Sequence, residues 1–73
     1  MAEHPAARRW AVERYDRKRA GLGVHGITQL ETLAKRAESE LLPVDQTERR
    51  LVEAEHQAVH DELKDRKKSY GLD

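Results

Sequence analysis

Two histidines one helical turn apart are the first residues of this sequence whose spacing suggests chemistry. His56 and His60 stand four residues apart in EHQAVHDE. On a helix, this spacing points both imidazoles to one side, where they can share a metal ion. The helical motif of zinc proteases requires Glu directly after the first histidine, whereas this chain has Gln57. No third ligand is evident, so the pair is a weak metal candidate. The simpler interpretation makes His56 a buried packing residue and His60 an exposed one.

A glycine motif has the spacing of a dinucleotide-binding loop. Gly21, Gly23 and Gly26 fit the pattern Gly-x-Gly-x-x-Gly, but a true site needs a strand before the glycines and a parallel strand after the following helix. Here a charged helical sequence precedes them and no strand pattern follows. The motif is therefore predicted to be a connector, in which Gly21 or Gly23 ends a helix in the left-handed conformation.

Residues suited to covalent catalysis are scarce. The chain has no cysteine, and its hydroxyl side chains are two serines and three threonines. A three-helix unit of this size is also expected to lack a cleft of the usual ligand volume. We therefore expect no catalytic residue, no cofactor and no small-molecule substrate.

Apolar residues recur at helical spacing along the whole chain. They predict a single all-α domain over residues 1–73, with helices at about 5–20, 28–42 and 46–69. The short connections favour antiparallel neighbours. The second and third helices should form an antiparallel hairpin, with the first helix packed alongside it or extended as an arm.

Helix ends are marked by recognisable residues. Thr28 and Glu31 fit a capping box, and Pro43 is expected to end the second helix at about residue 42. Asp45 should accept a hydrogen bond at the start of the third helix. Gly71 should end that helix.

Basic residues collect near two predicted helix ends. The first and third helices are parallel in this arrangement, so their C-terminal ends share one pole of the molecule. Cations there complement the helix dipoles, which is the structural interpretation. The functional alternative is contact with an anion or with nucleic acid. The candidates for such contact are Arg17, Lys18, Arg19, Lys64, Arg66, Lys67 and Lys68.

The composition leaves little material for a core. Of the 73 residues, 37% are apolar and 38% are charged, against about 45–50% and about 25% in an average globular chain. A core of this size rarely supplies more than about 3–5 kcal/mol, so a partner chain is expected to cover part of the apolar surface. The candidate protein-binding residues are Arg9, Trp10, Arg14, Tyr15, Arg17, Leu51, Ala58 and Tyr70.

These features predict a non-enzymatic interaction protein that acts as a regulator, inhibitor or assembly component. It would dock an apolar helix face, flanked by Arg and Lys, onto another protein chain in a homodimer or a hetero-complex. The alternative is a nucleic-acid-associated regulator that uses the basic helix ends, or residues 30–53 as a helix-turn-helix. A net charge of zero argues against nucleic acid. The N-terminal residues do not resemble a signal peptide, no segment is predicted to span a membrane, and the expected location is cytoplasmic.

Overall fold

A computed structural model describes residues 3–71 and contains three α-helices. They are α1 (Ala7–Gly21), α2 (Ile27–Ser39) and α3 (Gln46–Ser69), and a single 3₁₀ turn, η1 (Leu22–Val24), joins α1 to α2. Within the described range, no residue is in a strand. The prediction of an all-α, three-helix fold is confirmed.

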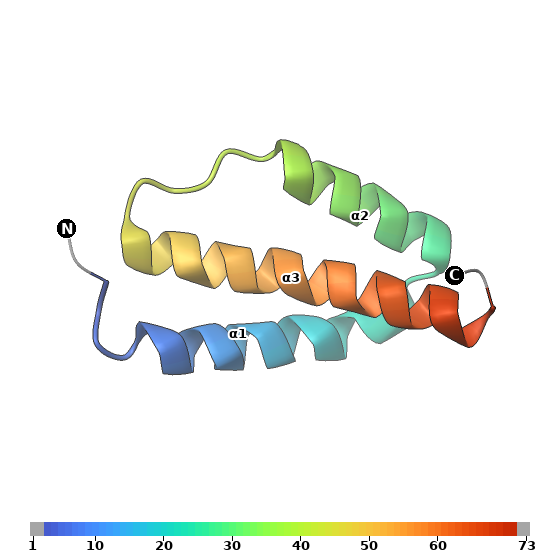
Figure 1. The fold of residues 1–73 in the computed structure, drawn as a ribbon, viewed down its shortest axis with the longest axis horizontal. Coiled ribbons are helices and arrows are strands. Elements are labelled where there is room, and N and C mark those ends of the chain that lie inside the picture. Colours follow the sequence, from blue (N-terminus) through green and yellow to red (C-terminus); the bar gives the residue numbers. More distant parts are fainter. Residues whose placement is uncertain (1–2, 72–73) are drawn as a thin grey trace.

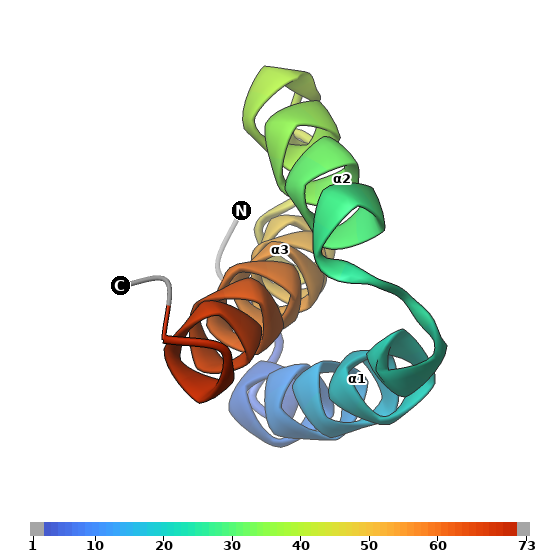
Figure 2. The same ribbon diagram turned by 90° about the vertical axis from the view of Figure 1, so that its right-hand side faces the viewer.

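The longest helix, α3, lies between the other two. α2 runs antiparallel to α3, and α1 runs parallel to it on its other side (Figure 1). α1 packs along α3 more extensively than α2 does, so the first helix is not an extended arm. Viewed from the end, α1 and α2 diverge from α3 (Figure 2). The result is an open, V-shaped arrangement measuring 43 × 23 × 20 Å.

The main core lies between α2, α3 and the η1 turn. Its buried members are Leu22, Leu30, Ala34 and Val59, with Leu33 and Leu63 packed against them. Leu30 is the largest side chain that is fully buried. The exposed area of 5436 Å² exceeds the value of about 4,600 Å² expected for a compact monomer of this mass. The radius of gyration, 13.3 Å, likewise exceeds about 11 Å for this length.

Small side chains form the contact between α1 and α3. Ala7 and Ala11 of α1 and Ala58 of α3 are buried, and side chains of this size let two helix backbones approach closely. Ala58 was expected to face a second chain, and that expectation is wrong because α1 of the same chain covers it. Both helices therefore contribute small side chains, Ala7 and Ala11 from α1 and Ala58 from α3, to this contact.

The start of α2 corrects one predicted cap. The helix begins at Ile27 after Gly26, whose backbone N–H donates to Gln29 Oε1 at 3.3 Å. Thr28 lies inside the helix, where its carbonyl accepts a hydrogen bond from the Thr32 hydroxyl. The earlier start places Ile27 three residues before the buried Leu30, on the same face of the helix.

The end of α2 also differs from the prediction. The helix stops at Ser39, before Pro43, and the Ser39 hydroxyl donates to the carbonyls of Lys35 and Arg36. The Arg36 carbonyl also accepts the backbone N–H of Glu40 at 3.0 Å, which closes the last turn. The predicted N-cap of α3 is confirmed, since Asp45 Oδ1 accepts the backbone N–H of Glu48 at 3.0 Å.

The glycine motif forms the connector between α1 and α2, as predicted, but without a left-handed residue. Gly21 has a φ of −78°, and among the described residues only Gly71, just past α3, has a positive φ. The connector is held instead by Arg66 of α3. Its guanidinium donates to the carbonyls of Leu22, Gly23 and His25 at 3.4, 3.0 and 2.7 Å, which fixes the direction in which α2 leaves.

Candidate functional site

The most prominent cavity of the described chain is a groove between α1 and α2. Its volume is about 520 Å³, which is within the usual range for ligand sites, so the expectation that this chain has no such cleft is wrong. We call it the α1/α2 groove. It is lined by Arg14, Arg17, Lys18, Gly21 and Leu22 on one side and by His25, Leu33 and Glu55 on the other.

Helical spacing places the cations on the wall of the groove. Arg14, Arg17 and Lys18 are three and four residues apart on α1, so they share one face of that helix. Leu22 continues the same face four residues later. It is buried with the core, so the floor of the groove is apolar beneath a basic rim.

The charge of the groove is only partly balanced. Arg14 Nη1 pairs with Glu55 Oε1 of α3 at 2.8 Å. Within residues 3–71, Arg17 and Lys18 have no ion-pair partner. With three cations to one carboxylate, the groove favours an occupant that carries negative charge.

A second, smaller cavity of about 210 Å³ shares Lys18, Leu33 and Glu55 with this groove. It extends the groove along α2 and is bordered there by Arg36, for which the described residues supply no acidic partner. The groove therefore continues toward the C-terminal end of α2, where the lining combines Lys18 and Arg36 with the carboxylates of Glu40 and Glu55.

His56, one of the two histidines, lines this second cavity. His56 Nε2 is 3.2 Å from Glu40 Oε2. Both His56 and His60 are partly buried, so His60 is less exposed than expected. Among residues 3–71, no group of three or more metal-ligating side chains comes together. In the structure, His56 therefore contacts Glu40 and is not part of a cluster of metal-ligating side chains among residues 3–71.

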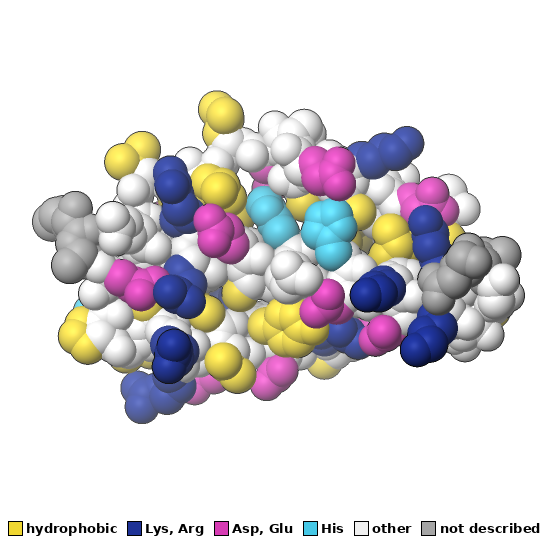
Figure 3. Space-filling model, viewed as in Figure 1, with side chains coloured by type: hydrophobic (Ala, Val, Ile, Leu, Met, Phe, Trp, Pro, Cys, Tyr) yellow, Lys and Arg dark blue, Asp and Glu magenta, His cyan; other side chains and the backbone are white. Residues whose placement is uncertain are grey.

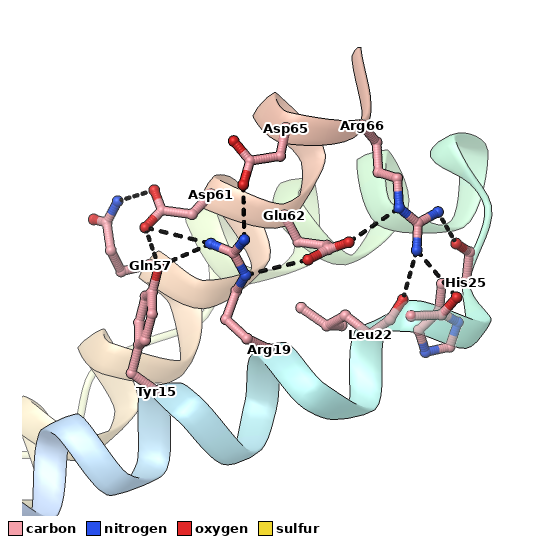
Figure 4. Close-up of polar contacts among 10 residues, drawn as sticks. Tyr15, Arg19, Leu22, His25, Gln57, Asp61, Glu62, Asp65 and Arg66 are labelled. Atoms are coloured by element: carbon pink, nitrogen blue, oxygen red, sulfur yellow. Dashed lines mark hydrogen bonds and ion pairs between the residues drawn. The ribbon is translucent and has the colours of Figure 1, made fainter. Parts of the chain in front are cut away.

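Two of the predicted anion contacts are used inside the chain (Figure 4). Arg19 lies within ion-pair distance of three carboxylates of α3, at 3.1 Å from Glu62 and 2.7 Å from Asp65 at the closest. Arg66 pairs with Glu62 at 3.0 Å and also holds the connector. Arg19 and Arg66 therefore join α1 and the connector to α3, which corrects their proposed role as anion contacts.

Tyr15 and Asp61 form a hydrogen-bonded pair at the edge of this network (Figure 4). The bond from the Tyr15 hydroxyl to Asp61 is the main reason why the pKa of Tyr15 is raised, and partial burial acts in the same direction. The same bond, followed by one from Gln57, lowers the pKa of Asp61. Tyr15 thus serves the α1–α3 contact within this chain.

This pair predicts how stability depends on pH. A raised pKa means that the contribution of Tyr15 to stability is present below about pH 10 and is lost as the pH rises through the raised value. The contribution of Asp61 is present above about pH 4 and is lost as the pH falls through its lowered pKa. A Tyr70→Phe variant retains Tyr15 as its single tyrosine, so tyrosinate absorbance should titrate in it with a midpoint above about pH 10. A midpoint at or below that value would show that the hydrogen bond to Asp61 is absent in solution.

The other predicted binding residues do not form one surface. Arg9 and Tyr70 are exposed, whereas Trp10 and Leu51 are partly buried. Trp10 stacks against His4 with 4.4 Å between ring centroids. Trp10 lies early in α1 and Tyr70 follows α3, and these helix ends are at opposite ends of the molecule (Figure 1). Only Arg14 and Arg17 of the predicted protein-binding set line the α1/α2 groove.

One face of the molecule, the one drawn in Figure 3, is mixed in charge. Basic and acidic side chains alternate over it, with histidines near its centre (Figure 3). Lys64, Lys67 and Lys68 extend the basic end of α3, but Asp61, Glu62 and Asp65 stand on the same helix. This face presents no field of a single sign, so the groove carries the stronger functional signal.

Comparison of the chain with protein-family models, with curated proteins and with solved structures gives no match. Function is therefore inferred from the surface itself. Over the part of the chain that the structure describes, the helices are too short or too polar for any of them to pass through a lipid bilayer.

Proposed function

We propose that this chain is a small protein-binding module whose α1/α2 groove receives an acidic, amphipathic segment of another polypeptide. The observation that carries the proposal is an apolar floor at Leu22 and Leu33 beside two rim cations, Arg17 and Lys18, that have no ion-pair partner among residues 3–71. An apolar centre supplies affinity by excluding water, and charges at the rim select and orient the partner.

The surface area supports a partner of this kind. The chain exposes about 800 Å² more than a compact monomer of its mass. α1 and α2 diverge (Figure 2), and each packs mainly on α3. A third helical or extended segment between them would complete the bundle.

Nucleic acid is the less favoured occupant. Net charge is zero, and Arg19 and Arg66 are neutralised by carboxylates of the same chain. The connection between α2 and α3 spans residues 40–45 and joins antiparallel helices (Figure 1). A helix-turn-helix instead has a turn of about three or four residues between helices that cross at a steep angle.

Binding of a synthetic peptide tests the proposal. A fluorescent helical peptide with Leu on one face and Glu on the other should bind, whereas the same peptide with Lys in place of Glu should not. Reversing the rim charges with Arg17→Glu and Lys18→Glu should weaken binding about tenfold or more. The matched control, Lys64→Glu with Lys68→Glu, should leave it unchanged because both lysines are outside the groove.

Short duplex DNA provides the competing outcome. If DNA binds instead, with an affinity that falls steeply with salt and is lost in the Lys64→Glu, Lys68→Glu control, the chain is a nucleic-acid-binding protein and the groove proposal fails. Equal binding of the acidic and basic peptides would also contradict it, because the rim would then select nothing.

A further inference from the structure

The loop between α2 and α3 exposes an unusual amount of apolar surface. Leu41 is 97% exposed and Val44 is 93% exposed, while Leu42 is 36% exposed. Pro43 stiffens the segment by fixing its own φ, and the backbone is extended on both sides, at Glu40 and Asp45. We call residues 41–44 the apolar loop. The apolar loop presents large side chains on a stiff backbone, and Leu41 and Val44 contribute little to the core of the chain.

The sequence on either side of the apolar loop is acidic, and one cation, Arg49 of α3, donates a hydrogen bond to the Pro43 carbonyl at 3.2 Å. Residues 37–48 contain no Lys or Arg. The acidic residues on either side of the loop are Glu38, Glu40, Asp45 and Glu48. The loop is therefore apolar with an acidic border, whereas the α1/α2 groove has an apolar floor with a basic rim. The two surfaces of the same chain are complementary in both respects.

Their positions prevent the loop from filling the groove of its own chain. The loop lies where α2 ends and α3 begins, while the cations Arg17 and Lys18 lie near the opposite end, where α1 ends (Figure 1). Leu41 and Val44 are almost fully exposed, so neither is folded back onto the chain. Two copies that lie side by side in opposite directions would bring each loop to the groove of the other.

We propose that the occupant of the α1/α2 groove is the apolar loop of a second copy of this chain, in a two-fold symmetric dimer with two identical loop–groove contacts. The inference rests on the proposed function and names the partner. Leu41 and Val44 of one copy pack on Leu22 and Leu33 of the other. The acidic border of the loop then faces Arg17 and Lys18 of that second copy. Because a two-fold axis pairs each loop with the groove of the other copy, no loop or groove is left free and the assembly stops at two copies.

Area and net charge agree with this assembly. The excess exposed surface of about 800 Å² is close to the area that each partner buries in a standard protein interface. A net charge of zero also means that two copies have no overall repulsion to overcome. The attraction arises between the acidic residues beside the loop and the basic rim of the groove.

Solution mass across a concentration series is the first test. Light scattering and sedimentation should show a monomer–dimer equilibrium for the unaltered chain. Leu41→Ser should raise the dimer dissociation constant about tenfold or more, because it removes a central apolar anchor. Val12→Ser is the matched control, since Val12 is exposed but lies outside both the loop and the groove. Unchanged helical circular dichroism would establish that both variants fold.

A charge exchange tests whether the loop meets the groove. One variant reverses the groove with Arg17→Glu and Lys18→Glu, and the other reverses the loop border with Glu38→Lys and Glu48→Lys. Each variant alone should be monomeric, because loop and groove then carry the same sign. Mixing the two should restore a dimer, since both contacts of the mixed pair join opposite signs. A dimer that survives in either single variant, or a mixture that stays monomeric, would overturn the proposal.

A peptide of residues 38–48 separates this inference from the proposed function. The peptide should bind the Leu41→Ser variant, whose groove is intact, and should dissociate the dimer of the unaltered chain. If the unaltered chain is monomeric and this peptide does not bind, while the designed acidic peptide still does, the groove binds a different protein. In that case the dimer is refuted and the proposed function stands.

Discussion

Leu30→Ala lowers the free energy of unfolding by about 2–5 kcal/mol, the cost of removing a large side chain from a well-packed site. Leu30 belongs to the main core and is fully buried. A core of this size supplies about 3–5 kcal/mol in total, so the variant should be largely unfolded at room temperature. Urea unfolding followed by circular dichroism measures the change.

Leu41→Ala is the matched control because it removes the same atoms from an exposed site. It should change stability by no more than about 0.5 kcal/mol when it is measured below the concentration at which the chain self-associates. If the two variants lose equal stability, the core is not where the structure places it. The pair thus distinguishes a leucine that folds the chain from one that is free to bind.

The sequence predicts the three helices because their signals are local. Ile27, Leu30 and Ala34 recur at helical spacing, and Asp45 is a strong N-cap, so these elements follow from residues close to one another. The ends of α2 are less predictable. Thr28 is a better capping residue than Gly26 in isolation, but starting the helix at Ile27 buries more apolar surface, and that gain depends on α3.

The candidate site is less predictable than the fold because it depends on how the helices are placed. The spacing of Arg14, Arg17 and Lys18 shows that they share a face. Only the divergence of α1 and α2 shows that this face borders a groove. Conversely, Arg19 belongs to the same basic cluster in the sequence, yet it points to α3 and is neutralised there. One position along the helix separates Lys18, which lines the groove, from Arg19, which is paired with α3.

The apolar loop carried a signal that was assigned only a structural meaning. Pro43 predicts the end of the second helix at about residue 42, which places Leu41 inside that helix. The helix ends at Ser39 instead, so Leu41 lies outside it and is exposed. Because α2 ends three residues before its predicted end, the exposed apolar loop at residues 41–44 could not be recognised from the sequence pattern.

Ala58→Leu is expected to destabilise the chain by about 1–3 kcal/mol, because it adds atoms to a site with no room for them. Ala58 is fully buried, and the small side chains of Ala7 and Ala11 bring α1 close to α3. A larger residue must push the two helices apart, which also strains the ion pairs of Arg14 and Arg19. Thermal and urea unfolding would measure the loss.

Ala20→Leu is the control for this substitution, since Ala20 is exposed near the end of α1 and an added side chain there should change stability by about 0.5 kcal/mol or less. The comparison decides between two roles for Ala58, contact with a second chain and contact with α1. If Ala58 faced a second chain, Ala58→Leu would leave the stability of the monomer intact and alter only association. If α1 covers it, unfolding becomes easier at every protein concentration, including those at which the chain is monomeric.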